Sequence, residues 1–287
     1  MNSNLKIDNK LITVGISFYN SELYLKFAID SIIKQTYSYW KLILIDDGSS
    51  DRSLEIANSY KDERISVLSD GINKGFQIRL NQLIEATDSV YFARMDADDI
   101  MHPQRLEKQV RFLENHPHID LVGSYAYSIS SSNKIAGFLS RPTEPNSIKD
   151  VFQNNCFIHP TVMGRTKWFK ANKYDDKSTR MEDFELWMRT IEKSKFYNLN
   201  EPLLFYREIG IPSIQKYLKT HSGLRSLVRK KFALRTVASY LTKSYLKCLV
   251  YYLFDKFGCI DFLIKKRSSL LNEIQIKEGQ EILKKII

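Results

Sequence analysis

The sequence predicts an α/β protein in which a mostly parallel sheet is flanked by helices. Short apolar runs typical of buried strands alternate with amphipathic helical segments through the first half of the chain. Loops rich in acids or glycine follow several of these runs. The 287 residues suffice for one large domain and an appendage. Strand–helix alternation of this kind favours parallel strands joined by crossover helices.

The elements of the first half follow one another without long gaps. Ser21 is expected to cap the first helix, in which Leu25, Ala28 and Ile32 recur at helical spacing. Asp51 opens the second helix, and Pro103 suits the first turn of the fourth. We expect strands at 11–18, 40–45, 65–68, 89–93 and 119–122, and helices at 21–34, 51–60, 76–86 and 103–116.

The second half is less regular. We expect a loop at 141–146, strands at 161–164 and 202–206, and a helix at 182–192. After 211–213 the chain becomes helical and basic up to its end. We therefore place a boundary here, with an α/β domain at 1–213 and a helical C-terminal region at 214–287.

The net charge of +10 is concentrated in this C-terminal region. From Ile214 onward there are 16 Lys and Arg against 5 Asp and Glu, which gives +11 and leaves −1 for the preceding residues. Aromatic residues interleave with the basic ones at 227–232 and 245–262. Two interpretations remain open: an amphipathic element that docks on an anionic membrane surface, or a helical lid that packs on the main domain. Without a recognised nucleic-acid module, no nucleic-acid partner is expected.

The compartment is expected to be the cytoplasm. Cys156, Cys248 and Cys259 are too scattered for a disulfide framework or a metal site. The amino terminus is polar, and no apolar run approaches the ~20 residues that span a membrane. We expect a cytoplasmic protein that is peripheral on the inner face of the cell membrane.

Acidic side chains follow the expected strand at 89–93. Asp96, Asp98 and Asp99 lie within four residues, and carboxylates at this spacing can share Mg²⁺ or Mn²⁺. Taken alone, such a triplet is more often a solvated turn. The loops at 19–20, 46–51 and 71–75 also follow strands, and the carboxyl ends of parallel strands form the usual ligand-binding edge of an open α/β sheet.

A set of short motifs resembles family-2 glycosyltransferases with the GT-A fold, a Rossmann-like nucleotide-binding architecture. Their order and spacing match over about residues 11–210, and the C-terminal region lies outside the resemblance. One departure is Ser17-Phe18, where relatives often have Pro-Thr, and another is the placement of Arg79 two residues before Asn81. The matching segments are 14–20, 46–51, 73–75, 93–99, 103–106, 159–163, 182–187 and 206–207.

The resemblance implies a nucleotide-sugar donor at the strand ends. Ser17, Tyr19 and Asp47 would border the base and ribose, and Arg79 would reach a phosphate. Asp98 would bind Mn²⁺ or Mg²⁺, together with Asp96, which would contact the ribose or the metal's water shell. Alternatives remain: Asp47 sits in a sequence that also favours a tight turn, and Arg79 could lie on a solvated helix face.

On the acceptor side, Asp183 is the expected general base, because a sugar hydroxyl is a poor nucleophile until a carboxylate removes its proton. His159, Glu182 and Trp187 are expected to contact the acceptor. Acids are also favoured at a helix amino terminus, Trp187 also suits the core, and His159 could be a buried residue with satisfied hydrogen bonds. One base without a second nucleophilic carboxylate indicates a single displacement with inversion at the anomeric carbon.

The expected function is that of a metal-dependent inverting glycosyltransferase. The donor would be a nucleotide sugar, with UDP as the expected nucleotide. The acceptor would be a saccharide, soluble or linked to polyprenyl diphosphate, in the synthesis of O-antigen, lipopolysaccharide or capsule. A sugar nucleotidyltransferase is one alternative, although the segment 18–22 lacks the glycine-rich phosphate loop that it would need. A catalytically silent nucleotide-sugar-binding protein is the other.

Overall fold

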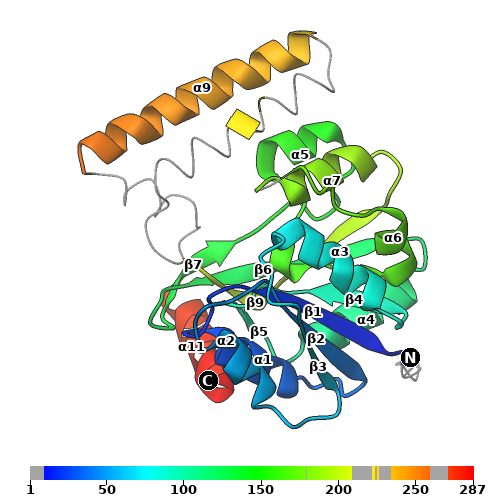
Figure 1. Cartoon of the computed structure of the whole chain (residues 1–287). Coiled ribbons are helices and arrows are strands. Elements are labelled where there is room, and N and C mark those ends of the chain that lie inside the picture. Colours follow the sequence, from blue (N-terminus) through cyan, green and yellow to red (C-terminus); the bar gives the residue numbers. More distant parts are fainter. Residues whose placement is uncertain (1–9, 179, 209–221, 224, 226–233, 259–270) are drawn as a thin grey trace.

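The computed structural model describes residues 10–178, 180–208, 222–223, 225, 234–258 and 271–287 (Figure 1). Within them, one sheet has the strand order β3-β2-β1-β4-β8-β6-β9-β5, and β7 pairs with β6. The strands are β1 (Ile12–Phe18), β2 (Trp40–Asp46), β3 (Ile65–Ser69), β4 (Tyr91–Arg94), β5 (Ile100–Met101), β6 (Leu121–Ile129), β7 (Ile135–Leu139), β8 (Met163–Arg165) and β9 (Phe196–Arg207).

Helices cover both faces of this sheet. The α-helices are α1 (Leu25–Ile33), α2 (Ser53–Asn58), α3 (Phe76–Ala86), α4 (Arg105–Asn115), α5 (Ile148–Asn154), α6 (Thr166–Ala171), α7 (Glu182–Thr190), α9 (Leu234–Lys256) and α11 (Glu273–Ile286), and a 3₁₀ turn spans His159–Thr161. The sequence had predicted α3 residue for residue. The expected N-cap of α1 is wrong: Tyr24 occupies that position, and the Ser21 hydroxyl donates to the Tyr19 carbonyl instead.

The sheet has a parallel half and a mixed half. β3, β2, β1 and β4 are all parallel, as the strand–helix alternation predicted. Beyond β4 the expectation of a mostly parallel sheet fails, because β8 is antiparallel to both β4 and β6, and only the β6–β9 pair is parallel. β6 and β9 also run further than predicted. Their alternating pattern is weak because both faces of this half are largely covered.

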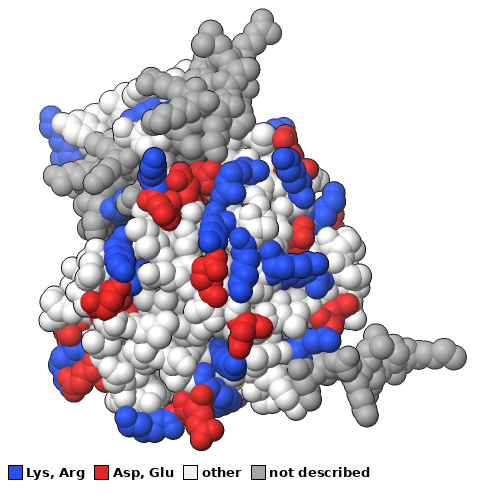
Figure 2. All heavy atoms as spheres, turned by 45° about the vertical axis from the view of Figure 1, so that its right-hand side comes forward, with Lys and Arg blue, Asp and Glu red and all other residues white. Residues whose placement is uncertain are grey.

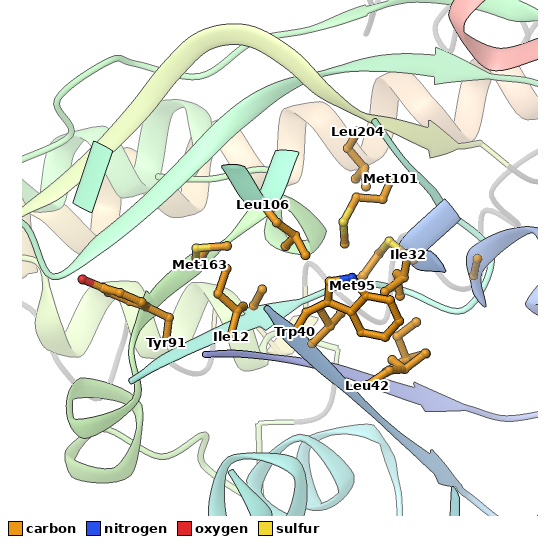
Figure 3. Packing of buried hydrophobic residues seen from close by; sticks show 14 of the residues in the cluster. Ile12, Ile32, Trp40, Leu42, Tyr91, Met95, Met101, Leu106, Met163 and Leu204 are labelled. Carbon is orange, nitrogen blue, oxygen red and sulfur yellow. The ribbon is translucent and has the colours of Figure 1, made fainter. Parts of the chain in front are cut away.

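Alternate residues of each central strand pack on opposite faces of the sheet. Ile12, Trp40 and Tyr91 belong to the cluster that packs against α1, α2 and α4, part of which is drawn in Figure 3. On the other face, Ile45 and Phe92 pack against α3, α6 and α7. The result is three layers, with the carboxyl ends of β1, β2 and β4 at one edge.

The C-terminal region is divided between two environments. Leu283 and Ile286 of α11 are buried against Tyr127, Ile129 and Phe205 of the sheet. α9 instead lies beyond α5 and α7 in Figure 1. The expected boundary at 211–213 and the basic segment at 227–232 lie outside the described residues.

Candidate active site

The loop after β2 is tied to the loop before α3. The Asp47 carboxylate, 5% exposed, accepts hydrogen bonds from the backbone N–H groups of Lys74 and Gly75. Gly48 has a φ of +76°, and a Cβ there would lie 2.8 Å from the Asn73 nitrogen. This close backbone approach requires glycine. The turn-forming interpretation of Asp47 is therefore correct in this structure, and direct nucleotide contact by Asp47 stays a prediction.

Arg79 does not lie on a solvated helix face. Its side chain is 2% exposed, and Nε donates to Asp47 at 2.9 Å. Nη1 donates to Asp70 and Gln82, and Nη2 to Asp70 and the Ile72 carbonyl. A guanidinium has five N–H donors, and all five are thus used within the protein. The expectation that Arg79 reaches a phosphate is contradicted. Arg79 instead holds Asp47, in the loop after β2, and Asp70, in the loop after β3.

Ser17 and Tyr19 lie where the sequence placed them, at the end of β1. Ser17 is buried at 7% exposure, and Tyr19 is about half exposed. Asn20 joins the following loop to the loop after β2, because its backbone N–H donates to the Ser49 hydroxyl and its side-chain oxygen accepts from the Ser50 N–H. These contacts bring the first two strand-end loops together.

The acidic loop after β4 is anchored to the end of β9. Asp99 is fully buried, and its Oδ1 accepts from the Arg207 backbone N–H at 2.9 Å. Arg207 Nε donates to the Asp98 carbonyl at 2.7 Å. Asp96 pairs with the buried Arg94. β9 thus shapes the loop, with the buried Asp99 as one of its anchors.

The residues of this loop fit a hard divalent cation. Asp96, Asp98 and Asp99 each offer a carboxylate oxygen, and these oxygens lie within 4.8 Å of one another. Burial, and then the charge of Asp96, raises the pKa of Asp98 to about 6. Asp99 Oδ2 is buried without a hydrogen-bond partner among the described residues. A cation would offset the crowding of these charges, and all-oxygen ligands suit Mg²⁺ or Mn²⁺.

A cavity of about 520 Å³ brings distant predicted residues together. Asp96 from the acidic loop, His159 from the 3₁₀ turn, and Glu182 and Asp183 from the start of α7 all line it. Asp98 is not in its wall but lies beside Asp96. A second cavity of about 560 Å³, formed by residues 73–77, Arg180 and Glu182, shares Phe76 and Glu182 with the first. The donor loops and the acceptor-side acids therefore border adjoining space.

Asp183 is held in place by two hydrogen bonds. Asn155 Nδ2 donates to its Oδ2 at 2.8 Å, and the Phe184 backbone N–H donates to its Oδ1 at 2.7 Å. Asn155 follows α5 with a φ of +59°, and its Oδ1 accepts from the Cys156 N–H. These contacts fix the carboxylate in the cavity wall. Its free lone pairs are the site at which a hydroxyl proton could be taken.

Burial favours the uncharged forms of two neighbours of Asp183. Burial, and then the charge of Asp183, raises the pKa of Glu182 to about 7. Burial, and then the charge of Arg94, lowers the pKa of His159 well below its ordinary value. His159 Nε2 lies 2.8 Å from the Tyr174 hydroxyl. Near pH 7, Glu182 is thus about half protonated and His159 is neutral, and both can form hydrogen bonds with an acceptor sugar.

Trp187 does not contact an acceptor. It is 0% exposed and packs against Phe157, Trp168 and Phe196. The expectation that Trp187 contacts the acceptor is therefore wrong. Trp187 lies one turn after Asp183, on the same side of α7; there that side is covered by the core cluster, whereas Asp183 at the helix start lines the cavity.

The sequence did not single out Arg94, Arg141 and Asn155, which also line the cavity. Arg94 is 2% exposed, and its Nε and Nη1 have no hydrogen-bond partner among the described residues. Arg94 ends a buried strand two residues before Asp96, and this position could have marked it as a candidate site residue from the sequence. Nothing local marks Asn155, because its partner Asp183 is 28 residues away.

The sequence matches the family model described as glycosyl transferase family 2 over residues 13–173. The chain is a family-2 glycosyltransferase. It is 30% identical over 251 residues to an Escherichia coli protein named O-antigen biosynthesis glycosyltransferase WbnJ, covering 83% of this chain and 95% of that protein. It is also 27% identical to the E. coli protein named UDP-Glc:alpha-D-GlcNAc-diphosphoundecaprenol beta-1,3-glucosyltransferase WfgD, over 68% and 75% of the two chains.

The fold of this glycosyltransferase is that of known relatives. S. aureus TarS 1-349, in a crystal structure titled as a complex with UDP-GlcNAc, aligns with a TM-score of 0.63 and 16% identity, over 82% of this chain and 71% of that one. The expected GT-A architecture is confirmed. The family match ends at residue 173, before Glu182 and Asp183, so the matched region contains the donor loops and the acidic triplet but not the proposed base.

Proposed function

We propose that this glycosyltransferase moves a sugar, with inversion, from a nucleotide-sugar donor to a saccharide acceptor, with Asp183 as the general base. The observation that carries the proposal is the shared cavity: Asp96 of the acidic triplet and Asp183 of α7 line the same space of about 520 Å³. Donor and acceptor chemistry would thus meet in one open cavity, where charged and polar groups are already positioned.

The donor is proposed to be UDP-linked. The TarS neighbour is titled as a complex with UDP-GlcNAc, and this chain shares its fold. The donor would lie along the loops after β1, β2 and β4, near Ser17 and Tyr19, with its diphosphate toward Asp96 and Asp98. Mg²⁺ or Mn²⁺ held by these acids would neutralise charge on the departing nucleoside diphosphate. Arg94, whose Nε and Nη1 have no hydrogen-bond partner within the described part of the chain, adds a fixed positive charge beside Asp96.

The chemical step is a single displacement. An acceptor hydroxyl oxygen attacks the anomeric carbon, and its proton passes to a carboxylate oxygen of Asp183. The bond between the anomeric carbon and the diphosphate oxygen breaks, and the nucleoside diphosphate leaves with the electron pair. Attack opposite the leaving group inverts the anomeric configuration, so that an α-linked donor gives a β-linked product.

The acceptor is proposed to be a lipid-linked saccharide in the synthesis of a bacterial surface polysaccharide. The name of WbnJ refers to O-antigen biosynthesis, and the name of WfgD refers to a diphosphoundecaprenol-linked acceptor. Glu182 and His159, both in the cavity wall, would hydrogen-bond the acceptor sugar. The enzyme would then act at the cytoplasmic face of the membrane, where nucleotide sugars are available.

A donor screen tests this proposal. Purified full-length protein is incubated with UDP-, GDP- and dTDP-sugars, with Mn²⁺ or with EDTA, and release of nucleoside diphosphate is measured. We expect slow hydrolysis of one UDP-sugar that EDTA abolishes. With an acceptor supplied, NMR of the product should show the inverted anomer, and retention of configuration would refute the single displacement.

The Asp183→Asn variant tests the role of the base. We expect transfer to fall by about 10²–10⁴-fold, because a general base typically contributes that much, while UDP binding measured by calorimetry stays within twofold. Asp88→Asn is the matched control, since Asp88 is 70% exposed and pairs with Lys41 on the surface. A protein that binds UDP-sugars but transfers nothing before the substitution would instead be the silent binding protein. The family match already favours the transferase over a nucleotidyltransferase.

A further inference from the structure

α9 carries a row of large apolar side chains on an exposed face. We call this face the α9 stripe, and its members are 41–60% exposed: Tyr245, Leu246, Leu249, Tyr252 and Leu253. They recur at intervals of three, four and seven residues, which places them on one side of the helix. The opposite side carries Cys248 and Tyr251, which are buried. Five such residues on one exposed side exceed the scattered apolar residues of an ordinary surface.

Positive charge accompanies the α9 stripe. Lys243 and Lys247 are exposed beside it, and α9 contains four Lys and Arg against one acid, Asp255. The chain from Ile214 onward carries +11, whereas the preceding residues carry −1. On the face seen in Figure 2, Lys and Arg alternate with Asp and Glu over the catalytic domain. The excess charge thus lies on the same part of the chain as the stripe.

The α9 stripe is connected to the acceptor side of the cavity. Arg225 stacks on the Tyr245 ring at 4.3 Å and donates to the Ser244 hydroxyl at 3.3 Å. Two residues earlier, Gly223 packs directly on Met181, because a Cβ there would lie 2.7 Å from the Met181 sulfur. Met181 immediately precedes Glu182 and Asp183. Figure 1 accordingly shows α9 beyond α5 and α7, the helices next to Asn155 and Asp183.

The other apolar helix of the C-terminal region is already covered. Leu283 and Ile286 of α11 are buried in the sheet cluster, so α11 belongs to the catalytic domain. Among the described helices, none is both long enough and apolar enough to cross a bilayer. α9 therefore suits a position in the plane of a membrane surface.

We propose that the α9 stripe docks on an anionic phospholipid surface and holds the acceptor side of the cavity toward it. Apolar side chains would enter the boundary between headgroups and acyl chains, and Lys243 and Lys247 would reach the phosphates. Lysines near an anionic leaflet add attraction that neutral lipid lacks. Docking by α9 stands independently of the reaction; only the orientation of the cavity rests on the proposed function.

Flotation with vesicles tests the docking. Full-length protein is mixed with vesicles of phosphatidylcholine alone, or with about 30% phosphatidylglycerol, and recovery in the lipid fraction is measured. We expect strong recovery with the anionic vesicles and weak recovery with the neutral ones. The triple variant Leu246→Gln, Leu249→Gln and Leu253→Gln should lower partitioning by about tenfold or more, and Lys243→Gln with Lys247→Gln by a smaller factor.

A matched control removes apolar side chains of similar exposure elsewhere. Leu23, Val90 and Ile274 are 49–70% exposed and lie on the catalytic domain and α11, and changing all three to Gln should leave flotation unchanged. Equal recovery of the stripe variant and the wild type, or no flotation of the wild type, would overturn the proposal. So would a dimer in light scattering that the stripe variant dissociates while flotation is unaffected, because the stripe would then bind a second copy.

Activity provides an independent readout. The stripe variant should keep wild-type transfer to a short-chain soluble acceptor and lose about tenfold with an acceptor embedded in anionic vesicles. If flotation falls but both activities are equal to wild type, the docking stands and the orientation of the cavity is wrong. If the wild type shows no transfer at all, the proposed function fails while the flotation result remains interpretable.

Discussion

The two halves of the catalytic domain are held together in different ways. On the donor side, the loops after β2 and β3 are joined by Asp47, Gly48 and Arg79 through largely buried contacts. On the acceptor side, the cavity wall contains Arg94, two of whose nitrogens find no hydrogen-bond partner among the residues that the structure describes, and Glu182, whose pKa is raised. The donor side is thus built as a rigid frame, and the acceptor side keeps polar groups available for chemistry.

This difference predicts that substitutions on the donor side act mainly on stability, and those on the acceptor side mainly on turnover. Arg79→Gln should have the largest effect on stability. It leaves the buried Asp47 carboxylate without its cation, and breaking such a pair costs about 3–5 kcal/mol. Urea unfolding measures it, with Arg111→Gln as the control, since the Arg111 side chain is 59% exposed in its pair with Glu107. A loss below about 1 kcal/mol would show that the frame does not depend on Arg79.

Gly48→Ala should come next. Its Cβ would meet the backbone at Asn73 and Ile72 within 3 Å, at a φ of +76°, which we expect to cost about 2–3 kcal/mol. Gly71→Ala separates the two causes, because Gly71 has a φ of +72° but no atom within 4 Å of the added Cβ. That control should cost only about 1 kcal/mol in the same unfolding measurement. Equal losses for both variants would mean that the contact between the two loops contributes nothing.

Substitution of Asn155 should change turnover more than stability. Asn155→Gly keeps the left-handed backbone but removes the hydrogen bond to Asp183, and we expect kcat to fall by about 10-fold. Asn155→Asp places a second carboxylate beside the base and should cost about 100-fold and shift the acidic limb of the pH–rate profile upward. KM for the donor should stay within twofold. An unchanged kcat in both variants would remove Asn155 from the proposed role of positioning Asp183, while leaving Asp183 itself untested.

The smallest effect concerns pH and Glu182. Burial raises the pKa of Glu182 from 4.5, its ordinary value, to about 7 in the folded protein. Glu182 therefore ionises more easily in the unfolded chain, and its ionisation favours unfolding. The stability contribution of Glu182 is therefore complete below pH 4.5 and is lost as pH rises through about 7. Between pH 5 and 8 we expect a loss of about 1–2 kcal/mol in the wild type that Glu182→Gln does not show. Urea unfolding at both pH values checks it, and parallel behaviour of the two proteins would contradict it.

The parallel half of the fold was predictable because its signals are local. Strands β1, β2 and β4 are continuous apolar runs, and α3 begins directly after Gly75, at the residue the sequence indicated. The mixed half of the sheet was less predictable. β5 has two residues and β8 has three, which is too short for a periodic signal, and the length of β9 depends on its pairing with β6.

The candidate site shows the same division. The acidic triplet and the Glu182-Asp183 pair were indicated by the set of motifs that resembles family-2 glycosyltransferases, and Asp96, Glu182 and Asp183 do line one cavity. Arg79 and Trp187 could not be assigned correctly, since burial decided their roles: Arg79 is saturated by Asp47 and Asp70, and Trp187 lies in the core.

The sequence by itself determined the family, the strand–helix alternation of the parallel half, the acidic loop and the concentration of positive charge after Ile214, since each of these depends on residues that are close together in the chain. Only the tertiary structure decided that Asn155 holds Asp183, that β9 anchors the acidic loop, and that α11 joins the core while α9 exposes its apolar side. Contacts between residues tens to hundreds of positions apart depend on how the layers pack, and no local pattern encodes that packing.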